Sequence, residues 1–239
     1  MLSRLAAVLL LAAPLHGCLA YEYEHEFWLR TDGSGSVYVT GRPALFVAFK
    51  GLGRLEDPEG TATREAARAF FEKAGLRVNR VTITRRSGQR YLFVSADFDD
   101  VNKLSGSGAF PDLDIALRRE GRRLRLAGAW RPPPAAPAVP SQLREGLLAV
   151  RFHLPSKIYL HENAHDGVER GNIVSWRQQV AQAQSDRPLA FGAVMDDRSI
   201  LFSTVLLFGC AIGLAVLILV SVFALVRQRG RKQATAPPH

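Results

Sequence analysis

The sequence predicts an α+β fold of antiparallel hairpins with one main soluble helix, plus a single C-terminal transmembrane helix. Three observations indicate this class. Apolar and polar residues alternate in several short segments separated by Gly-containing turns, which is typical of antiparallel strands. One segment switches to helical spacing. A long segment near the C-terminus carries no charge and is long enough to cross a bilayer.

Residues 1–20 are predicted to be a secretory signal peptide. Arg4 precedes a run of about ten apolar residues, and small residues follow that run. Such a run is too short for a spanning helix, so the mature chain is expected to be exported. Residues 15–18 also resemble a lipobox, in which Cys18 would become the lipidated first residue of a lipoprotein. Removal of Cys18 by an ordinary signal peptidase is the alternative.

Three hairpins are expected in residues 21–131. Tyr21 to Phe27 alternate, with aromatic and His side chains on one face and Glu on the other, and "DGSGS" turns the chain into "VYVTG". The second hairpin joins "VNRVTIT" to "YLFVSADF" through "RRSGQR". The third turns at Glu120-Gly121, and "DDVNKLSG" forms a short capped turn before it. The Gly-rich "GSGS" and "SGSG" lack the strand-to-helix context of a phosphate loop, so both are interpreted as turns.

The main helix is expected in "TATREAARAFFEKAG", residues 61–75. Ala66, Phe70 and Ala74 share a stripe at helical spacing with Ala67 and Phe71. Thr61 or Thr63 is expected to cap the N-terminus, and Gly75 to end the helix.

Residues 132–140 are interpreted as a Pro-rich spacer, because "RPPPAAPAVP" holds five prolines in ten residues. Residues 141–198 are expected to continue the exported domain with a strand "GLLAVRFHLP", a β-hairpin that ends at Trp176, and a juxtamembrane segment. The strand "NIVSW" is expected to bury Trp176.

Residues 199–226 are predicted to span a membrane, because they hold no charge and at about 1.5 Å per residue exceed the ~30 Å hydrocarbon core. The tail, residues 227–239, carries four basic residues and no acid. The positive-inside bias therefore predicts a single-pass cell-membrane protein with a cytoplasmic tail and an extracytoplasmic domain. Gly209 and Gly213 have small-xxx-small spacing, which would let another membrane protein's helix approach closely.

The net charge of +9 is partly a consequence of this topology. Without the signal peptide and the tail, the exported part is only about +4. We therefore expect no nucleic-acid partner. The two cysteines, Cys18 and Cys210, lie outside the exported domain, so a hydrophobic core without disulfides must stabilise it.

His161-Glu162-Asn163-Ala164-His165 matches the H-E-x-x-H pattern of zinc proteases. That chemistry needs both histidines on one helix face, whereas "KIYLH" favours a strand and Asp166-Gly167 favours a turn. A zinc metalloprotease is therefore kept only as an alternative, as is a metal site in a sheet that adds His153. No Ser or Cys residue has a nucleophile motif around it, so we expect neither an enzyme nor a cofactor.

A group of arginines surrounds the third hairpin turn. Because side chains at a hairpin tip are free to reach a surface, these residues could contact anionic lipid headgroups or envelope polymers; a solvated hairpin is the alternative. The group consists of Arg118, Arg119, Arg122, Arg123 and Arg125.

The order of these segments resembles the LppM-type domain of bacterial envelope lipoproteins. The shared features are the Gly-Cys end of the signal, "TDGSGSVYV", the central α+β section, "LPSKIYLHENAHDGVERGNIVSW" and one transmembrane helix. The matching positions in the last motif are Asn163, Asn172 and Trp176. The resemblance implies an envelope-associated binding or scaffold domain without catalysis that contacts lipid or glycolipid. A structural subunit of a membrane complex is the other alternative.

Overall fold

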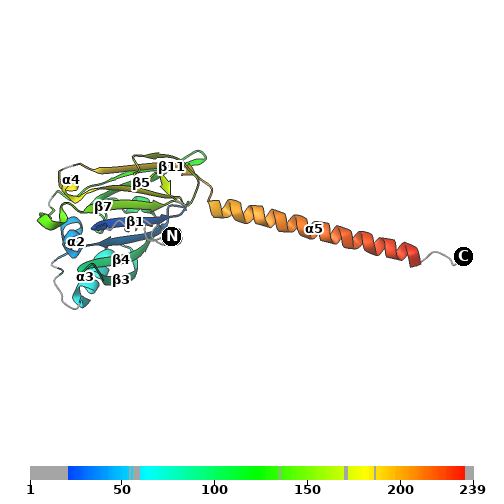
Figure 1. The fold of residues 1–239 in the computed structure, drawn as a ribbon, viewed down its shortest axis with the longest axis horizontal. Helices are drawn as coiled ribbons and strands as arrows, with labels where there is room; N and C mark the ends of the chain where they lie inside the picture. Colours follow the sequence, from blue (N-terminus) through cyan, green and yellow to red (C-terminus); the bar gives the residue numbers. More distant parts are fainter. Residues whose placement is uncertain are drawn as a thin grey trace, which may run out of the picture.

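The computed structural model describes residues 21–53, 55, 60–134, 136–169, 172–185 and 187–234. The predicted signal peptide, with Cys18, and the last five residues of the tail lie outside the described residues. The described part consists of two β-sheets packed against each other, three short helices beside them, and one long C-terminal helix that projects from the domain (Figure 1). The predicted α+β class with antiparallel strands and a long apolar C-terminal helix is confirmed.

The larger sheet has seven strands, and one pairing in it is parallel. Strands β1 and β7 run in the same direction, although they come from opposite sides of the Pro-rich segment. The other neighbours are antiparallel, including the first two expected hairpins. In spatial order the strands are β3 (Arg77–Arg86), β4 (Gln89–Phe98), β2 (Gly35–Gly41), β1 (Tyr23–Leu29), β7 (Leu147–His153), β10 (Ile173–Gln179) and β9 (Val168–Glu169).

The smaller sheet has four antiparallel strands in the order β5 (Leu113–Glu120), β6 (Arg123–Trp130), β11 (Leu189–Asp196) and β8 (Ile158–Glu162). Its β5–β6 hairpin turns where the sequence predicted, with Gly121 at a φ of 63°. The expected hairpin of "KIYLH" with "NIVSW" is wrong, because β8 pairs with β11 whereas β10 belongs to the larger sheet. Residues 189–196, expected as a juxtamembrane segment, form a strand.

Helix α3 (Thr61–Lys73) is the predicted main helix, but two details of the prediction are wrong. Its N-cap is Gly60, with a φ of 74°, and Thr61 is already helical. Of the predicted stripe, Ala67 and Phe71 are buried and Phe70 and Ala74 are partly buried, whereas Ala66 is exposed. The apolar stripe therefore faces the sheet as predicted, except at Ala66.

Two shorter helices were not expected. Helix α2 (Pro43–Lys50) begins at a proline, whose fixed φ suits the first helical position, and stops at Gly51 with a φ of 70°. Helix α4 (Val180–Gln184) follows β10 directly. Two 3-10 turns, η1 (Val101–Lys103) and η2 (Ser141–Leu143), complete the list; the side chain of Asp100 caps η1, as the sequence predicted.

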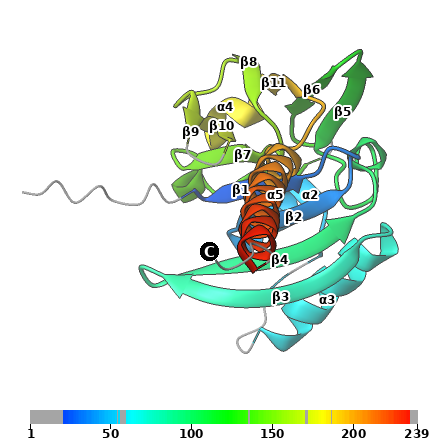
Figure 2. The ribbon, with the colours of Figure 1, turned by 90° about the vertical axis from the view of Figure 1, so that its right-hand side faces the viewer.

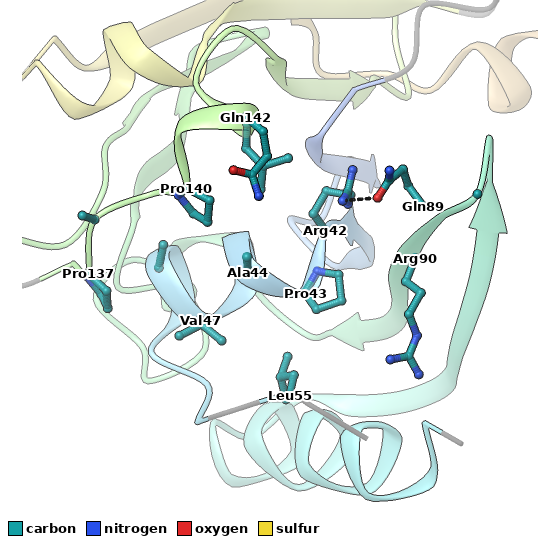
Figure 3. Close-up of a pocket in the computed structure, with 14 residues that line it drawn as sticks. Arg42, Pro43, Ala44, Val47, Leu55, Gln89, Arg90, Pro137, Pro140 and Gln142 are labelled. Carbon is teal, nitrogen blue, oxygen red and sulfur yellow. Dashed lines mark hydrogen bonds between the residues drawn. The ribbon is translucent and has the colours of Figure 1, made fainter. Parts of the chain in front are cut away.

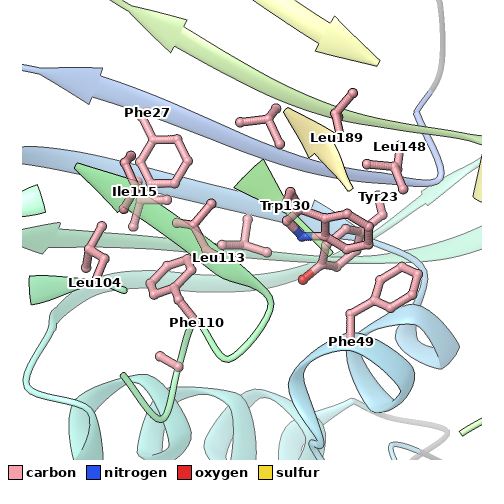
Figure 4. Packing of buried hydrophobic residues seen from close by; sticks show 14 of the residues in the cluster. Tyr23, Phe27, Phe49, Leu104, Phe110, Leu113, Ile115, Trp130, Leu148 and Leu189 are labelled. Carbon is pink, nitrogen blue, oxygen red and sulfur yellow. The ribbon is translucent and has the colours of Figure 1, made fainter. Parts of the chain in front are cut away.

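The core lies between the larger sheet on one side and α2, α3 and the smaller sheet on the other, an arrangement visible in Figure 2. Figure 4 shows Tyr23, Phe49 and Trp130 gathered at one end of this core. Where β10 of the larger sheet meets β11 of the smaller sheet, the rings of Trp176 and Phe191 are 5.7 Å apart. Trp176 is fully buried, as expected. Each large apolar side chain buried in this way contributes about 1.5–3 kcal/mol, so the core explains stability without disulfides.

The C-terminal helix α5 (Ile200–Ala234) contains one segment, Ile200–Leu225, that is long and apolar enough to cross a bilayer. None of that segment is buried against the rest of the protein. The end of the domain that faces α5 contains the C-terminal end of β7, because the backbone N–H of Ile200 donates to the carbonyl of Pro155 at 3.1 Å. Helices α2 and α4 lie at the opposite end (Figure 1).

Candidate functional site

The tip of the β5–β6 hairpin lies beside the start of the apolar helix. The backbone N–H of Asp197 donates to the carbonyl of Arg122 at 3.2 Å, and Asp196 pairs with Arg123 across the sheet. The N–H of Asp196 also donates to the carbonyl of Lys157 at 2.9 Å. If α5 crosses a bilayer, this tip is the part of the smaller sheet that lies at the membrane surface.

The five arginines of the tip differ in their partners. Arg119 bonds Asp197 at 2.7 Å and so ties the tip to the segment before α5. Arg125 bonds Glu120 at 3.2 Å on its own hairpin, and the guanidinium of Arg123 lies 5.0 Å from the ring centroid of Tyr159. Arg122 is exposed in the turn itself.

Arg118 and Arg125 are cross-strand partners on the outer face of the smaller sheet. They line a shallow hollow of about 370 Å³ together with Asp114, Glu120 and a floor of small side chains. The acids in this hollow moderate its positive charge. Arg122 and Arg123 are the arginines of the tip that lie next to α5, and the carboxylate of Asp196 lies beside them.

The H-E-x-x-H residues lie on a strand and a turn. His161 is on β8 opposite Ala193, and Glu162 ends that strand. His165 follows in a turn, where its Nδ1 accepts a 3.4 Å hydrogen bond from the backbone N–H of Arg177. This backbone does not provide the one-turn helical spacing that zinc proteases use. Within the described ranges, no group of three or more His, Cys, Asp or Glu side chains is arranged to hold a metal.

Two neighbours of the motif have structural roles. The carbonyl of Glu162 accepts a hydrogen bond from the indole N–H of the buried Trp176. His153 lies on β7 and bonds Glu26 at 2.7 Å. The three histidines considered for a metal site therefore come from a strand of each sheet and from a turn.

A groove of about 850 Å³ lies at the end of the domain opposite α5. Figure 3 shows α2 with the Pro-rich segment on one side and the start of β4 on the other. Its apolar lining includes Val47, Leu55 and Pro140, whereas Arg90 lies at its polar side. Arg42 donates to Gln89 at 2.6 Å at the same side. An apolar floor with cationic and amide groups at one side suits an amphipathic ligand.

The sequence did not predict this groove. Residues 132–140 were interpreted as a spacer, yet Val139 is buried and Pro137 and Pro140 form a wall of the groove. The only sequence signal was the density of prolines, which indicates extended backbone but says nothing of what packs against it.

A fully buried polar cluster connects α2 to both sheets. Lys50 donates to Asp112 at 2.6 Å, and the indole N–H of Trp130 donates to the other carboxylate oxygen at 2.9 Å. His25 lies 3.7 Å from Asp112 and 3.3 Å from the hydroxyl of Tyr23. The alternation of Tyr23, His25 and Phe27 already placed His25 on the inner face, but Lys50 and Asp112 carried no sequence pattern.

Burial determines the ionisation of this cluster. It lowers the pKa of Lys50 to about 8, although the neighbouring carboxylate of Asp112 acts in the opposite direction. Burial also raises the pKa of Asp112, whereas the positive charge of Lys50 lowers that pKa. Burial and then the charge of Lys50 hold the pKa of His25 well below its ordinary value, so this imidazole is neutral. The cluster is buried away from solvent, so it stabilises the packing of the core and is not accessible to a ligand.

Comparisons with known proteins give one structural similarity. No family model matches the chain, and no curated protein matches it. The structure is similar to the NMR structure of the folded domain of the Mycobacterium tuberculosis protein LppM, with a TM-score of 0.38 and 13% sequence identity. The similarity covers 77% of this chain and 95% of that domain. A similarity of this size transfers no residue role.

Proposed function

We propose that this chain is a membrane-anchored extracytoplasmic binding or scaffold protein of the bacterial cell envelope that contacts anionic lipid headgroups, of phospholipid or glycolipid, through the β5–β6 tip. Helix α5 is the anchor, and the basic tail behind it remains in the cytoplasm. Other membrane proteins contact it through α5. The domain acts by binding, without catalysis or a cofactor.

One observation supports the contact with headgroups. The backbone bond between Arg122 and Asp197 and the ion pair between Arg119 and Asp197 hold the hairpin tip beside the first turn of α5. A spanning helix that starts at Ile200 therefore brings Arg122 and Arg123 into the headgroup region. Each basic residue near an anionic surface contributes about 1 kcal/mol, and this attraction falls off within a Debye length of about 8 Å at physiological salt.

Hydrogen exchange of the full chain in lipid nanodiscs tests the contact. The backbone amides around Arg122 are expected to exchange more slowly in nanodiscs with anionic phosphatidylglycerol than in nanodiscs of phosphatidylcholine alone. High salt is expected to remove this difference, because the attraction is screened. The variant Arg122→Gln/Arg123→Gln is expected to exchange equally in both lipids.

A charge-matched control separates local contact from net charge. Arg85 and Arg86 end β3 at the side of the domain opposite α5, so Arg85→Gln/Arg86→Gln removes two charges far from the tip. This variant is expected to keep the lipid dependence of the wild type. Equal protection of the tip in both lipids, or loss of protection in the control variant, would contradict the proposed contact.

A further inference from the structure

Four aromatic rings form a continuous row on the outer face of the larger sheet. They are Phe93 on β4, Tyr38 on β2, Trp28 on β1 and His153 on β7, four strands that lie next to one another. Neighbouring ring centroids are 5.6 Å, 6.3 Å and 3.5 Å apart along the row. The last pair is stacked, with 10° between the planes. We name this set the aromatic row.

The register of the sheet produces the row. Trp28 lies directly opposite His153 on the parallel strand β7. Trp28 pairs with Ser36 on β2, so Tyr38 is its diagonal neighbour, and Phe93 is in turn diagonal to Tyr38. Diagonal neighbours on one sheet face lie within reach when both side chains are aromatic.

Trp28 differs from the other tryptophans of the chain. Its exposed fraction is 44%, whereas Trp130 and Trp176 are fully buried. An exposed tryptophan inside a contiguous aromatic patch is typical of a binding surface rather than of the solvated face of a sheet.

The polar groups beside the row are paired with one another. Glu26 bonds His153 at 2.7 Å, and Arg151 lies 3.3 Å from Glu24 and 3.8 Å from Glu26. Asp97 accepts a 2.7 Å hydrogen bond from the hydroxyl of Ser36. This face therefore presents many hydrogen-bonding groups. Its carboxylates Glu24, Glu26 and Asp97 lie among several guanidinium groups, those of Arg30, Arg77, Arg86 and Arg151, so the face carries charges of both signs.

We propose that the aromatic row is a platform for a neutral glycan chain built of pyranose rings. The C–H faces of such sugars pack on aromatic rings, and their hydroxyls are hydrogen-bond donors that suit the carboxylates of Glu24 and Glu26 and acceptors that suit Arg151. A neutral ligand suits this face, because its charges of both signs are already paired with one another. The proposal rests on the exported location proposed above and not on the lipid contact of the hairpin tip.

Binding of the full chain in detergent micelles to three neutral polysaccharides tests this proposal. The probes are microcrystalline cellulose, chitin and mannan. At least one is expected to retain the wild type. Trp28→Ala is expected to weaken that binding about tenfold, which corresponds to about 1.4 kcal/mol. Trp28→Phe keeps a ring at this position and is expected to recover part of the loss.

Tryptophan fluorescence gives a readout that a loss of folding would not imitate. Because the other two tryptophans are buried, acrylamide quenching reports mainly on Trp28. The polysaccharide that binds is expected to reduce acrylamide quenching of the wild type and to leave that of Trp28→Phe unchanged. Leu160→Ala is a matched control, because Leu160 is a large exposed side chain, 55% accessible, on the smaller sheet; its glycan binding is expected to equal that of the wild type.

Three results would overturn the proposal. The first is no retention of the wild type by any of the three polysaccharides. The second is equal retention of the wild type and Trp28→Ala. The third is contact of the aromatic row with a bilayer, which is tested because Trp28 lies at the end of the sheet that faces α5. In vesicles of brominated phosphatidylcholine, quenching of the wild type that disappears in Trp28→Phe would place the row against lipid. Failure of these tests leaves the lipid contact of the hairpin tip unaffected.

Discussion

The buried ion pair between Lys50 and Asp112 allows a quantitative test of the core. Both side chains are fully buried, and the ammonium and carboxylate groups are 2.6 Å apart. Lys50→Met removes one charge and leaves the other buried without a counter-charge. Such a change typically costs about 3–5 kcal/mol, a large fraction of the ~5–15 kcal/mol by which a domain is stable.

The double variant Lys50→Met/Asp112→Asn should lose much less. It leaves no buried charge, and the amide oxygen of the new asparagine can still accept the hydrogen bond from the indole N–H of Trp130. Keeping this bond avoids the ~1–3 kcal/mol penalty of a buried unsatisfied donor. We therefore expect the double variant to be more stable than Lys50→Met, with a coupling of several kcal/mol in the double-mutant cycle.

Urea unfolding of residues 21–198 measures these free energies, since the described core lies between Tyr23 and Met195. The pH dependence provides a second check. The pKa of Lys50 is about 8 in the folded state and ordinarily 10.5, so the unfolded state binds more protons between these values and stability rises with pH. Above about pH 10 the raised pKa of Tyr23 acts in the opposite direction. In the double variant the rise from pH 8 to 10 should be absent.

Two results would refute this reasoning. One is a loss below about 1 kcal/mol in Lys50→Met, which would mean that the carboxylate of Asp112 is hydrated or protonated in the folded domain. The other is a double variant that loses as much as the sum of the two single variants, which would mean that the two charges do not interact.

Three further predictions concern the domain as a whole. Residues 21–198, without signal and anchor, should be soluble and unfold in one cooperative transition; broad melting in calorimetry would contradict this. Trp176→Ala should cost about 3–5 kcal/mol, because the ring is fully buried, whereas His161→Ala and His165→Ala should cost about 0.5 kcal/mol each. Thermal melts of these three variants with and without a chelator check this, and a chelator effect lost in both histidine variants would reveal a metal site. Gly128→Ala should cost about 1–3 kcal/mol, since a Cβ there would clash with the backbone carbonyl of Asp114 and lie 2.6 Å from the ring of Phe191; an unchanged urea midpoint would show that both the β5 backbone and this ring shift freely.

The sequence alone determined the features that depend on neighbouring residues. Alternation predicted the β1–β2 hairpin and the separation of aromatic and Glu side chains on β1, and Gly-containing turns located the hairpins that turn at Ser87-Gly88 and Gly121. Helical spacing and Gly75 located the body and the end of α3. A long uncharged run located the apolar part of α5. Each of these signals lies within one continuous segment of the chain.

Only the tertiary structure decided the features that join distant segments. The parallel pairing of β1 with β7 and the placement of β8 and β10 in different sheets have no local signal, because a strand pattern specifies a face and not a partner. Helix α2 escaped prediction since its apolar residues are buried with little polar contrast between its faces. The aromatic row and the pair of Lys50 with Asp112 arise from side chains that are far apart in the sequence and meet only when the sheets assemble.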